Sequence, residues 1–344
     1  MIKVGKSSSF QNFGKDSKFE DKDWYKSIPI YNNQQPRLLE NFNKDTKFED
    51  EEFKSVENSL ISPETKEKIL EECNKTIKDA QNKIKNLSRN NKIDKEEYEK
   101  IIEKEKYKIQ QIENLLTFKE WKRISDLYKN YELFPSELDS DSFDQSFIED
   151  CYFLSMVSLI SKEPNLIRRL FQIPKNPYGY YEVILFIKGW KRVIIDDKIP
   201  GKITSNEKFI PLQSIPKKKC FYNFLIEKAW AKVNKMYYNI YGGRCIDSLE
   251  ALTGFKGNIT LLQNLDLSQQ YYFLEKIYEI IKFEKQLFGV GNHSHAFSLL
   301  DIKKIHINDL DYHLDLELRN PWGNTFYENI FDDLIEQKKE KFVH

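Results

Sequence analysis

Apolar residues recur at alternating steps of three and four over 63–116, in two runs separated by the polar letters SRNNKID. This spacing is typical of one apolar face of a helix, and only Glu105 stands clearly out of the pattern. Ser62 and Pro63 precede the first run. They are typical of a helix start, because serine caps the first N–H groups and proline fits the first turn. Two helices joined by a short polar loop predict an antiparallel helical hairpin.

The role of this hairpin has two interpretations. Its other faces are rich in Lys and Glu, so it either packs on itself as an insertion or docks a helical partner. Cys73 lies in its apolar face and is interpreted as a small core residue rather than a reactive thiol.

Beyond residue 118 the pattern contains both helical and strand-like stretches, and we predict one compact unit over 118–344. Helical spacing covers 147–171 and 221–238. Aromatic and β-branched runs flank Lys188-Gly189, which predicts a β-hairpin. Further elements are expected at 249–254, 271–283, 287–290, 295–302 and 314–318. A helical first half followed by a strand-rich second half predicts an α+β fold with a central cleft.

Residues 1–60 are polar and show no sustained period. The heptapeptide at 15–21 is echoed at 44–50, and an aromatic residue follows each copy, Trp24 and Phe53. Two copies are too few for a solenoid. We predict an extended segment that its aromatic residues anchor to the surface, with plain disorder as the alternative for the first part.

Composition narrows the functional class. Lys+Arg and Asp+Glu both number 54, so the formal net charge is zero, which argues against a nucleic-acid partner. No signal-peptide pattern and no run of about 18 apolar residues occurs, so no membrane span is expected. The four cysteines show no CxxC pair. We therefore predict reduced thiols and a cytoplasmic, intracellular setting.

One cysteine stands where chemistry is expected. Cys151 lies near the start of the apolar helical stretch at 147–171, and the N–H groups of a helix N-terminus favour a thiolate. Taken alone, such a cysteine is more often a core residue. A base is also needed, and His295 is favoured over His293 as that base. Asn320 follows the next strand and could orient the imidazole. The step of 144 residues from Cys151 to His295 fits papain-like order.

Three segments, in the same order, resemble the motifs of the calpain family of cysteine proteases. They are Gln145 to Cys151 (QSFIEDC), Asn292 to Ser298 (NHSHAFS) and Arg319 to Gly323 (RNPWG). Weaker agreement occurs at 193–200, 227–232, 242–243, 252–254, 48–53 and 121–123. The resemblance covers about 48–60 and 118–330, and it makes the hairpin at 63–116 an insertion.

The resemblance implies a papain-like fold with two lobes, a helical lobe over 118–255 and a β-rich lobe over 256–344. It implies that Cys151 attacks the scissile carbonyl, that His295 activates the thiol and that Asn320 orients the histidine. Gln145 would donate to the oxyanion, and Trp322 would shield the histidine–asparagine hydrogen bond.

Several positions depart from the family pattern. Glu149 stands where the family has Gly, and a glutamate there would narrow the cleft or favour basic side chains nearby. Tyr152 replaces Trp, Ser294 replaces the Gly before the histidine, and Ser146 replaces the Gly after Gln145. These departures bear on efficiency and specificity more than on the fold. Cys220 and Cys245 are expected to be structural.

The resemblance also raises calcium as an activator, although the chemistry itself needs no cofactor. Asp139, Asp141 and Asp144 lie near one expected site, but their register does not match it. Asp332 and Asp333 are poor substitutes for a second site. We therefore assign no metal ligand from the sequence.

The favoured hypothesis is a cysteine endopeptidase that cleaves intracellular proteins by limited proteolysis through a Cys–His–Asn triad. The alternative is a catalytically impaired calpain-like module that acts through its hairpin. Acyl transfer, as in transglutaminase-like folds, is less favoured because the third residue there is Asp.

Overall fold

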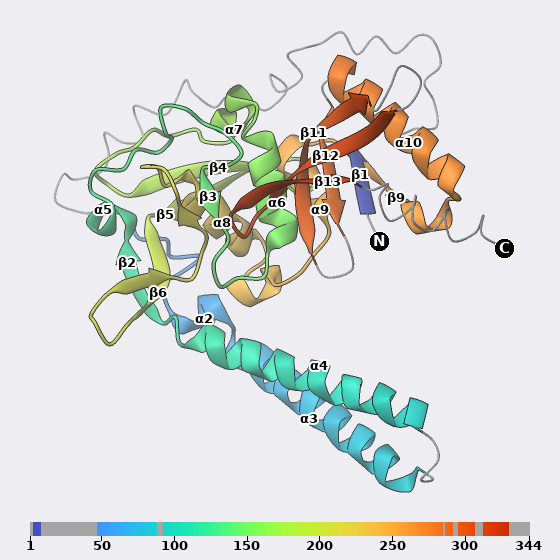
Figure 1. The fold of residues 1–344 in the computed structure, drawn as a ribbon. Helices are drawn as coiled ribbons and strands as arrows, with labels where there is room; N and C mark the ends of the chain where they lie inside the picture. Colours follow the sequence, from blue (N-terminus) through green and yellow to red (C-terminus); the bar gives the residue numbers. More distant parts are fainter. Residues whose placement is uncertain are drawn as a thin grey trace.

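The structure is a computed structural model that describes residues 3–7, 47–87, 92–284, 286–291, 295–306 and 312–329. It mixes helices and sheets, as expected from the sequence (Figure 1). The predictions made for the repeat at 15–21 and for His293, Ser294, Asp332 and Asp333 lie outside the described residues.

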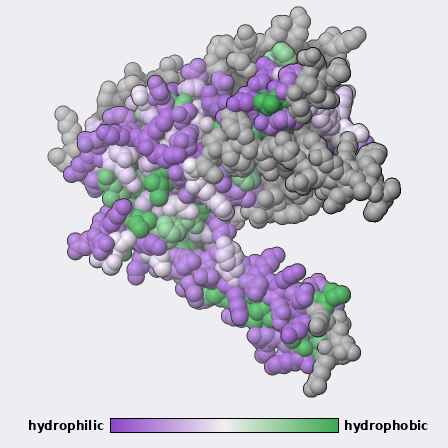
Figure 2. Space-filling model, viewed as in Figure 1, coloured by the Kyte–Doolittle hydropathy of each residue, from purple (hydrophilic) through white to green (hydrophobic). Residues whose placement is uncertain are grey.

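Two long helices form the predicted hairpin. They are α3 (Pro63–Asn86) and α4 (Lys92–Leu116), which pack along each other and extend away from the rest of the chain (Figure 1). The Ser62 hydroxyl accepts from the Thr65 backbone N–H at 3.2 Å, which caps α3. The surface of the hairpin is mostly hydrophilic (Figure 2).

The out-of-pattern Glu105 has a partner within the hairpin. Its side chain is buried, and the Lys108 Nζ lies 2.7 Å from its carboxylate. The buried Cys73 thiol also hydrogen-bonds this carboxylate. Glu105 is therefore accommodated by pairing instead of by exposure to water.

The larger part of the chain surrounds α6 (Cys151–Ile160), whose side chains beyond the first residue are buried. The sequence predicted helical structure over 147–171 with a break at Pro164, and the first helix begins only at Cys151. A second helix, α7 (Pro164–Arg169), starts at a proline that fits its first turn. The other helices here are α2 (Glu57–Leu60), α5 (Ile124–Leu127), α8 (Tyr222–Val233) and α9 (Cys245–Thr253).

Small antiparallel sheets flank these helices. The Lys188-Gly189 hairpin is confirmed: both residues have positive φ, 55° and 129°, between β4 (Tyr180–Phe186) and β5 (Trp190–Asp196). The remaining strands are β2 (Glu120–Arg123), β3 (Phe143–Asp144), β6 (Lys198–Ile203), β7 (Phe209–Pro211) and β8 (Ile215–Pro216).

A six-stranded antiparallel sheet forms the second part, with strand order β13-β12-β11-β10-β1-β9. Helix α10 (Leu267–Glu279) has a capping box at Asp266 and Gln269, and a π-helical turn, Ile280–Glu284, follows it. The three expected strands of this region are present, as β10 (Phe288–Gly291), β11 (Ala296–His306) and β12 (Tyr312–Asn320). The strands β9 (Gly257–Leu261) and β13 (Asn324–Asn329) were not predicted.

Strand β1 (Lys3–Ser7) corrects the expectation of a surface segment at the very N-terminus. It lies inside the sheet, where Val4 pairs with Val290 on one side and Thr260 on the other. An inserted strand satisfies the edges of β9 and β10, which would otherwise present unpaired backbone groups.

The second repeat copy is held by specific contacts. Phe53 is 3% exposed and packs against Tyr237, and Phe48 meets the Tyr180 ring edge-on at 4.9 Å. The Lys232 Nζ lies 2.8 Å from the Asp50 carboxylate. The described part of this segment is therefore anchored through its aromatic residues and one acidic residue.

Two apolar cores are joined by polar contacts beside α6. One core surrounds α6 and α8, and the smaller one lies between α10 and the six-stranded sheet. The Ser298 hydroxyl of β11 donates to the Ser155 carbonyl of α6 at 2.6 Å. Arg319 of β12, 1% exposed, donates to the Phe143 carbonyl at 2.9 Å. These bonds place the N-terminus of α6 against the ends of β11 and β12. Among the described helices, none is long and apolar enough to cross a membrane.

Candidate active site

Cys151 is the first residue of α6, with Asp150 at the N-cap. Its side chain is partly exposed, unlike the residues that follow it in the helix. The backbone N–H groups of Tyr152 and Ala296 hydrogen-bond the sulfur. Ala296 directly follows His295. Cys151 and His295 are therefore brought close together at the junction of the two apolar cores.

The charge state of this sulfur differs from the expected thiolate. Burial raises the pKa of the Cys151 thiol above its ordinary value, and the negative charges of Asp150 and Glu149 add to the rise. The two backbone N–H groups act in the opposite direction but do not outweigh burial. Burial therefore opposes the thiolate, and a base that accepts the thiol proton would offset it.

His295 is held through one ring nitrogen. Its Nε2 lies 2.8 Å from Oδ1 of Asn320, and the Trp322 backbone N–H donates to the same oxygen at 3.0 Å. An Nε2–H that donates to Asn320 leaves Nδ1 as the basic nitrogen of the neutral ring. The structure therefore brings His295 and Asn320 together, with the Asn320 amide oxygen facing the Nε2 atom of the imidazole.

Aromatic rings surround the imidazole. The Trp322 ring lies 4.3 Å from it, centroid to centroid, and the Phe297 ring meets it edge-on at 4.7 Å. Trp322 is nevertheless 66% exposed, so it covers one face of the imidazole while its outer side remains in water.

Gln145 lies beside the site, but its amide is engaged in its own loop. The side-chain Nε2 donates to the Ile148 carbonyl at 2.7 Å, and the backbone N–H donates to Pro321 at 2.7 Å. Its Oε1 is buried without a hydrogen-bond partner in the described residues. Donation to an oxyanion would use the second N–H of this amide or a rotation of the side chain.

Two buried carboxyl groups lie behind the cysteine, and sequence reasoning gave neither a role. Glu227 accepts from the Ser214 backbone N–H at 3.0 Å and from its hydroxyl at 2.6 Å. Burial raises the pKa of Glu227 to about 7. Burial, with the added charge of Glu227, raises the pKa of Asp150 well above its usual range. Both residues fall in segments that resemble family motifs, which was the only available signal.

The acidic residues considered for calcium are paired with cations. Asp139 contacts Lys218 at 2.5 Å, and Asp141 contacts Lys217 at 2.8 Å. Asp144 lies 2.7 Å from the Arg319 guanidinium. In the described ranges, no group of three or more His, Cys, Asp or Glu residues could hold a metal ion. These carboxylates do not fit a calcium site as they are arranged, because their charge is already neutralised.

The other cysteines have structural positions. None of the four forms a disulfide. Burial raises the pKa of Cys73 to about 11 and that of Cys220 to about 12, so both keep their protons. Cys245 begins α9 and packs against the larger core.

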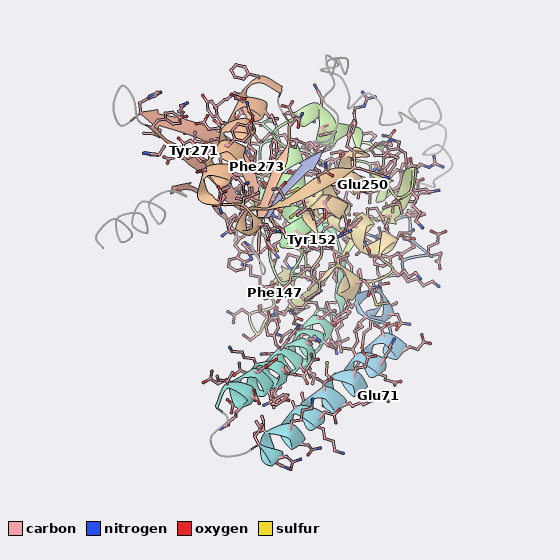
Figure 3. All side chains as sticks on the ribbon, turned by 90° about the vertical axis from the view of Figure 1, so that its right-hand side faces the viewer. Glu71, Phe147, Tyr152, Glu250, Tyr271 and Phe273 are labelled. Atoms are coloured by element: carbon pink, nitrogen blue, oxygen red, sulfur yellow. The ribbon has the colours of Figure 1, made fainter. Side chains whose placement is uncertain are left out.

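Two of the departures from the family pattern make definite contacts. The Tyr152 hydroxyl accepts from the Trp230 indole N–H at 3.0 Å, and its ring packs against Gly243, where a Cβ would meet ring atoms at 2.4 Å. Glu149 accepts a short hydrogen bond from the Tyr107 hydroxyl of α4. Figure 3 shows Phe147 and Tyr152 on the side of the chain from which the hairpin extends.

Comparison with known proteins agrees with the resemblance read from the sequence. A family model described as calpain family cysteine protease matches residues 97–340. The calpain-type cysteine protease DEK1 of Zea mays is 27% identical over 255 residues, which cover 65% of this chain and 11% of the relative. Calpain-14 of Homo sapiens is 25% identical over 231 residues, which cover 62% of this chain and 32% of the relative. The chain thus spans from about a tenth to a third of the length of these relatives.

Proposed function

Because the chain belongs to the calpain family of cysteine proteases, we propose that it is a cysteine endopeptidase that cleaves proteins by limited proteolysis. The observation that supports the proposal is that Cys151, His295 and Asn320 lie close to one another at the junction of the two cores. The His295 Nε2 is held by Asn320 at 2.8 Å, and the sulfur of Cys151 is hydrogen-bonded to the backbone N–H of the residue after His295.

In the proposed mechanism the Cys151 thiol transfers its proton to His295 Nδ1, and the sulfur attacks the scissile carbonyl carbon. The Cys151 backbone N–H and the Gln145 amide would donate to the oxyanion, each donor worth about 2.7–4 kcal/mol. The imidazolium then protonates the leaving amine as the C–N bond breaks. Water, deprotonated by His295, hydrolyses the thioester and regenerates the thiol.

The same proposal covers the architecture. We assign a papain-like helical lobe to 118–255 and a β-rich lobe to 256–344, with the cleft at the junction of the two cores. The hairpin at 63–116 is an insertion into this core. Residues 1–60 form the segment before it, of which β1 belongs to the six-stranded sheet. The protein substrates and the cytoplasmic setting are predictions of the same proposal. A helical partner on the hairpin is a separate prediction, which does not follow from protease function. The surface of the hairpin is mostly hydrophilic, so such a partner would have to bind through polar contacts.

A second candidate function is a catalytically impaired module that acts through its hairpin. Two observations favour it: burial raises the pKa of Cys151, and the Gln145 amide is bonded to Ile148. Calcium does not enter the proposed chemistry. Its role as an activator is tested by comparing activity with and without a chelator.

The proposal is tested by incubating the purified full-length protein with a denatured protein substrate and with an epoxysuccinyl inhibitor. We expect cleavage that stops when one inhibitor molecule adds to Cys151, and no cleavage by Cys151→Ala. Cys245→Ala is the matched control and should cleave normally. Absence of both cleavage and adduct, with and without calcium, would contradict the endopeptidase and leave the interaction module as the better account.

A further inference from the structure

The hairpin reaches the candidate active site through one contact. Tyr107 of α4 donates its hydroxyl to the carboxylate of Glu149, which lies two residues before Cys151. Gln111, one turn along α4, hydrogen-bonds the same hydroxyl. A residue of the hairpin therefore fixes an acidic side chain beside the nucleophile.

Glu149 lies in the loop that leads directly into α6 at Cys151. Its negative charge contributes to the raised pKa of the Cys151 thiol and to that of the Tyr241 hydroxyl, so it acts on both groups electrostatically. Its own backbone carbonyl accepts from the Gly242 N–H at 2.8 Å, so the loop that carries it is fixed. The side chain itself is exposed.

The charge of Glu149 is available to an incoming group. Within the described part of the chain, no lysine or arginine forms an ion pair with it, and Tyr107 supplies only a neutral hydroxyl. An ionised carboxylate has about four acceptor sites, so the tyrosine leaves acceptor capacity unused. The nearby Lys108 of α4 is paired with Glu105 at 2.7 Å and does not compete.

Two exposed aromatic residues belong to this region. Tyr107, which hydrogen-bonds the carboxylate, is 53% exposed, and Phe147, two residues before Glu149 in the chain, is 45% exposed. Phe147 is already within 4.5 Å of one ammonium group, the Nζ of Lys202, measured to its ring centroid. A carboxylate in a region that also exposes aromatic rings is a suitable environment for a cationic side chain.

Resting on the proposed protease function, we propose that Glu149, held by Tyr107, selects substrates with a Lys or Arg side chain next to the scissile bond. The ammonium or guanidinium group would pair with the Glu149 carboxylate while the peptide carbonyl lies at the Cys151 sulfur. The hairpin thereby contributes to substrate selection, through Tyr107, as a part of the cleft wall. Tyr107 is a positioning residue, because it acts through Glu149.

The test is a positional-scanning library of fluorogenic peptides, with the wild-type full-length protein and two variants. We expect Lys and Arg to be preferred over Gln at one position beside the cleaved bond. Glu149→Gln should reduce that preference about fivefold, the order expected for a partly exposed ion pair, and should act through KM. Tyr107→Phe keeps the carboxylate and should reduce the preference by less. Raising the salt concentration should weaken the wild-type preference, because exposed charges are screened.

Glu71→Gln on α3 and Tyr272→Phe on α10 are the matched controls, since both side chains are exposed and lie on other helices (Figure 3 labels Glu71). Both should keep the wild-type preference. If epoxide labelling of Cys151 continues but the preference for Lys and Arg is absent, or persists in Glu149→Gln, this inference is overturned and the proposed function is not. Loss of labelling and of all peptide cleavage would overturn the proposed function and this inference with it.

Discussion

The Nε2 atom of His295 lies 2.8 Å from Oδ1 of Asn320. His295 directly precedes β11, and Asn320 is the last residue of β12. The Trp322 backbone N–H donates to the same oxygen at 3.0 Å, and this second hydrogen bond fixes the orientation of the asparagine amide. The RNPWG turn thus orients the asparagine, and the asparagine orients the histidine.

Asn320→Ala should lower kcat/KM by about 10²-fold, because proton transfer by a correctly positioned base contributes at least that factor. The expected change is mainly in kcat, since the substrate contacts remain. Steady-state kinetics on a protein-derived peptide measure it. Asn239→Ala, which removes an exposed amide bonded only to the Asn234 carbonyl, is the control. Equal kcat in Asn320→Ala and wild type would remove the orienting role.

Stability should fall as pH rises from about 4.5 to about 7 because of Glu227. Burial raises the pKa of Glu227 from 4.5 to about 7 in the folded state. Between those values the folded state binds more protons than the unfolded state, so the free energy of unfolding decreases with increasing pH. The raised pKa of Asp150 acts in the same direction.

Glu227→Gln should therefore flatten this dependence and raise stability at pH 8, since the amide keeps an acceptor for Ser214 and carries no charge. Urea unfolding at pH 5, 6, 7 and 8 measures the effect, with Glu71→Gln as the exposed control. An unchanged slope in Glu227→Gln would show that another group causes the pH dependence.

Arg319→Met should destabilise the protein by about 1–3 kcal/mol, because it leaves the buried Phe143 carbonyl and the partly buried Asp144 carboxylate without their donor. The arginine is 1% exposed and bridges the six-stranded sheet to Asp144 at 2.7 Å and to the Phe143 carbonyl at 2.9 Å. Denaturant unfolding provides the measurement. Arg244→Met, at an exposed pair with Asp247, should change stability by at most about 1 kcal/mol. Similar values for the two variants would argue against a bridging role.

Phe53→Ala should cost about 3–5 kcal/mol, the range for removing a buried aromatic ring. Phe53 is 3% exposed and its ring lies 5.8 Å from that of Tyr237. Thermal and urea unfolding should both report the loss. Phe283→Ala, at a position 82% exposed, should have little effect. If Phe53→Ala were equally neutral, the segment at 47–53 would not be an integral part of the core.

Local signals in the sequence predicted much of the fold. Ser62 and Pro63 marked the start of α3, and Lys188-Gly189 marked the β4–β5 turn, because both depend on backbone geometry within a few residues. The mixed helix and sheet class followed from the same patterns. The start of α6 at Cys151 was less precise, since the apolar spacing extends before the helix begins.

Contacts between distant parts of the chain could not be predicted. Strand β1 pairs with strands more than 250 residues away, and five residues carry too little pattern to specify such partners. The contact of Tyr107 with Glu149 joins a hairpin helix to the nucleophile loop. The resemblance supplied candidate site residues. It could not supply the bond from Gln145 to Ile148 or the raised pKa of Cys151, which depend on packing.

The most direct test of the account is the alkylation rate of Cys151 by iodoacetamide as a function of pH, in wild type and in His295→Ala. We predict that wild type reacts well below the ordinary pKa of a cysteine, because His295 takes the thiol proton and the ion pair forms. His295→Ala should react only above that value, because no base then offsets the burial that raises the pKa of the Cys151 thiol. Identical pH profiles for the two proteins would contradict the pairing of Cys151 with His295.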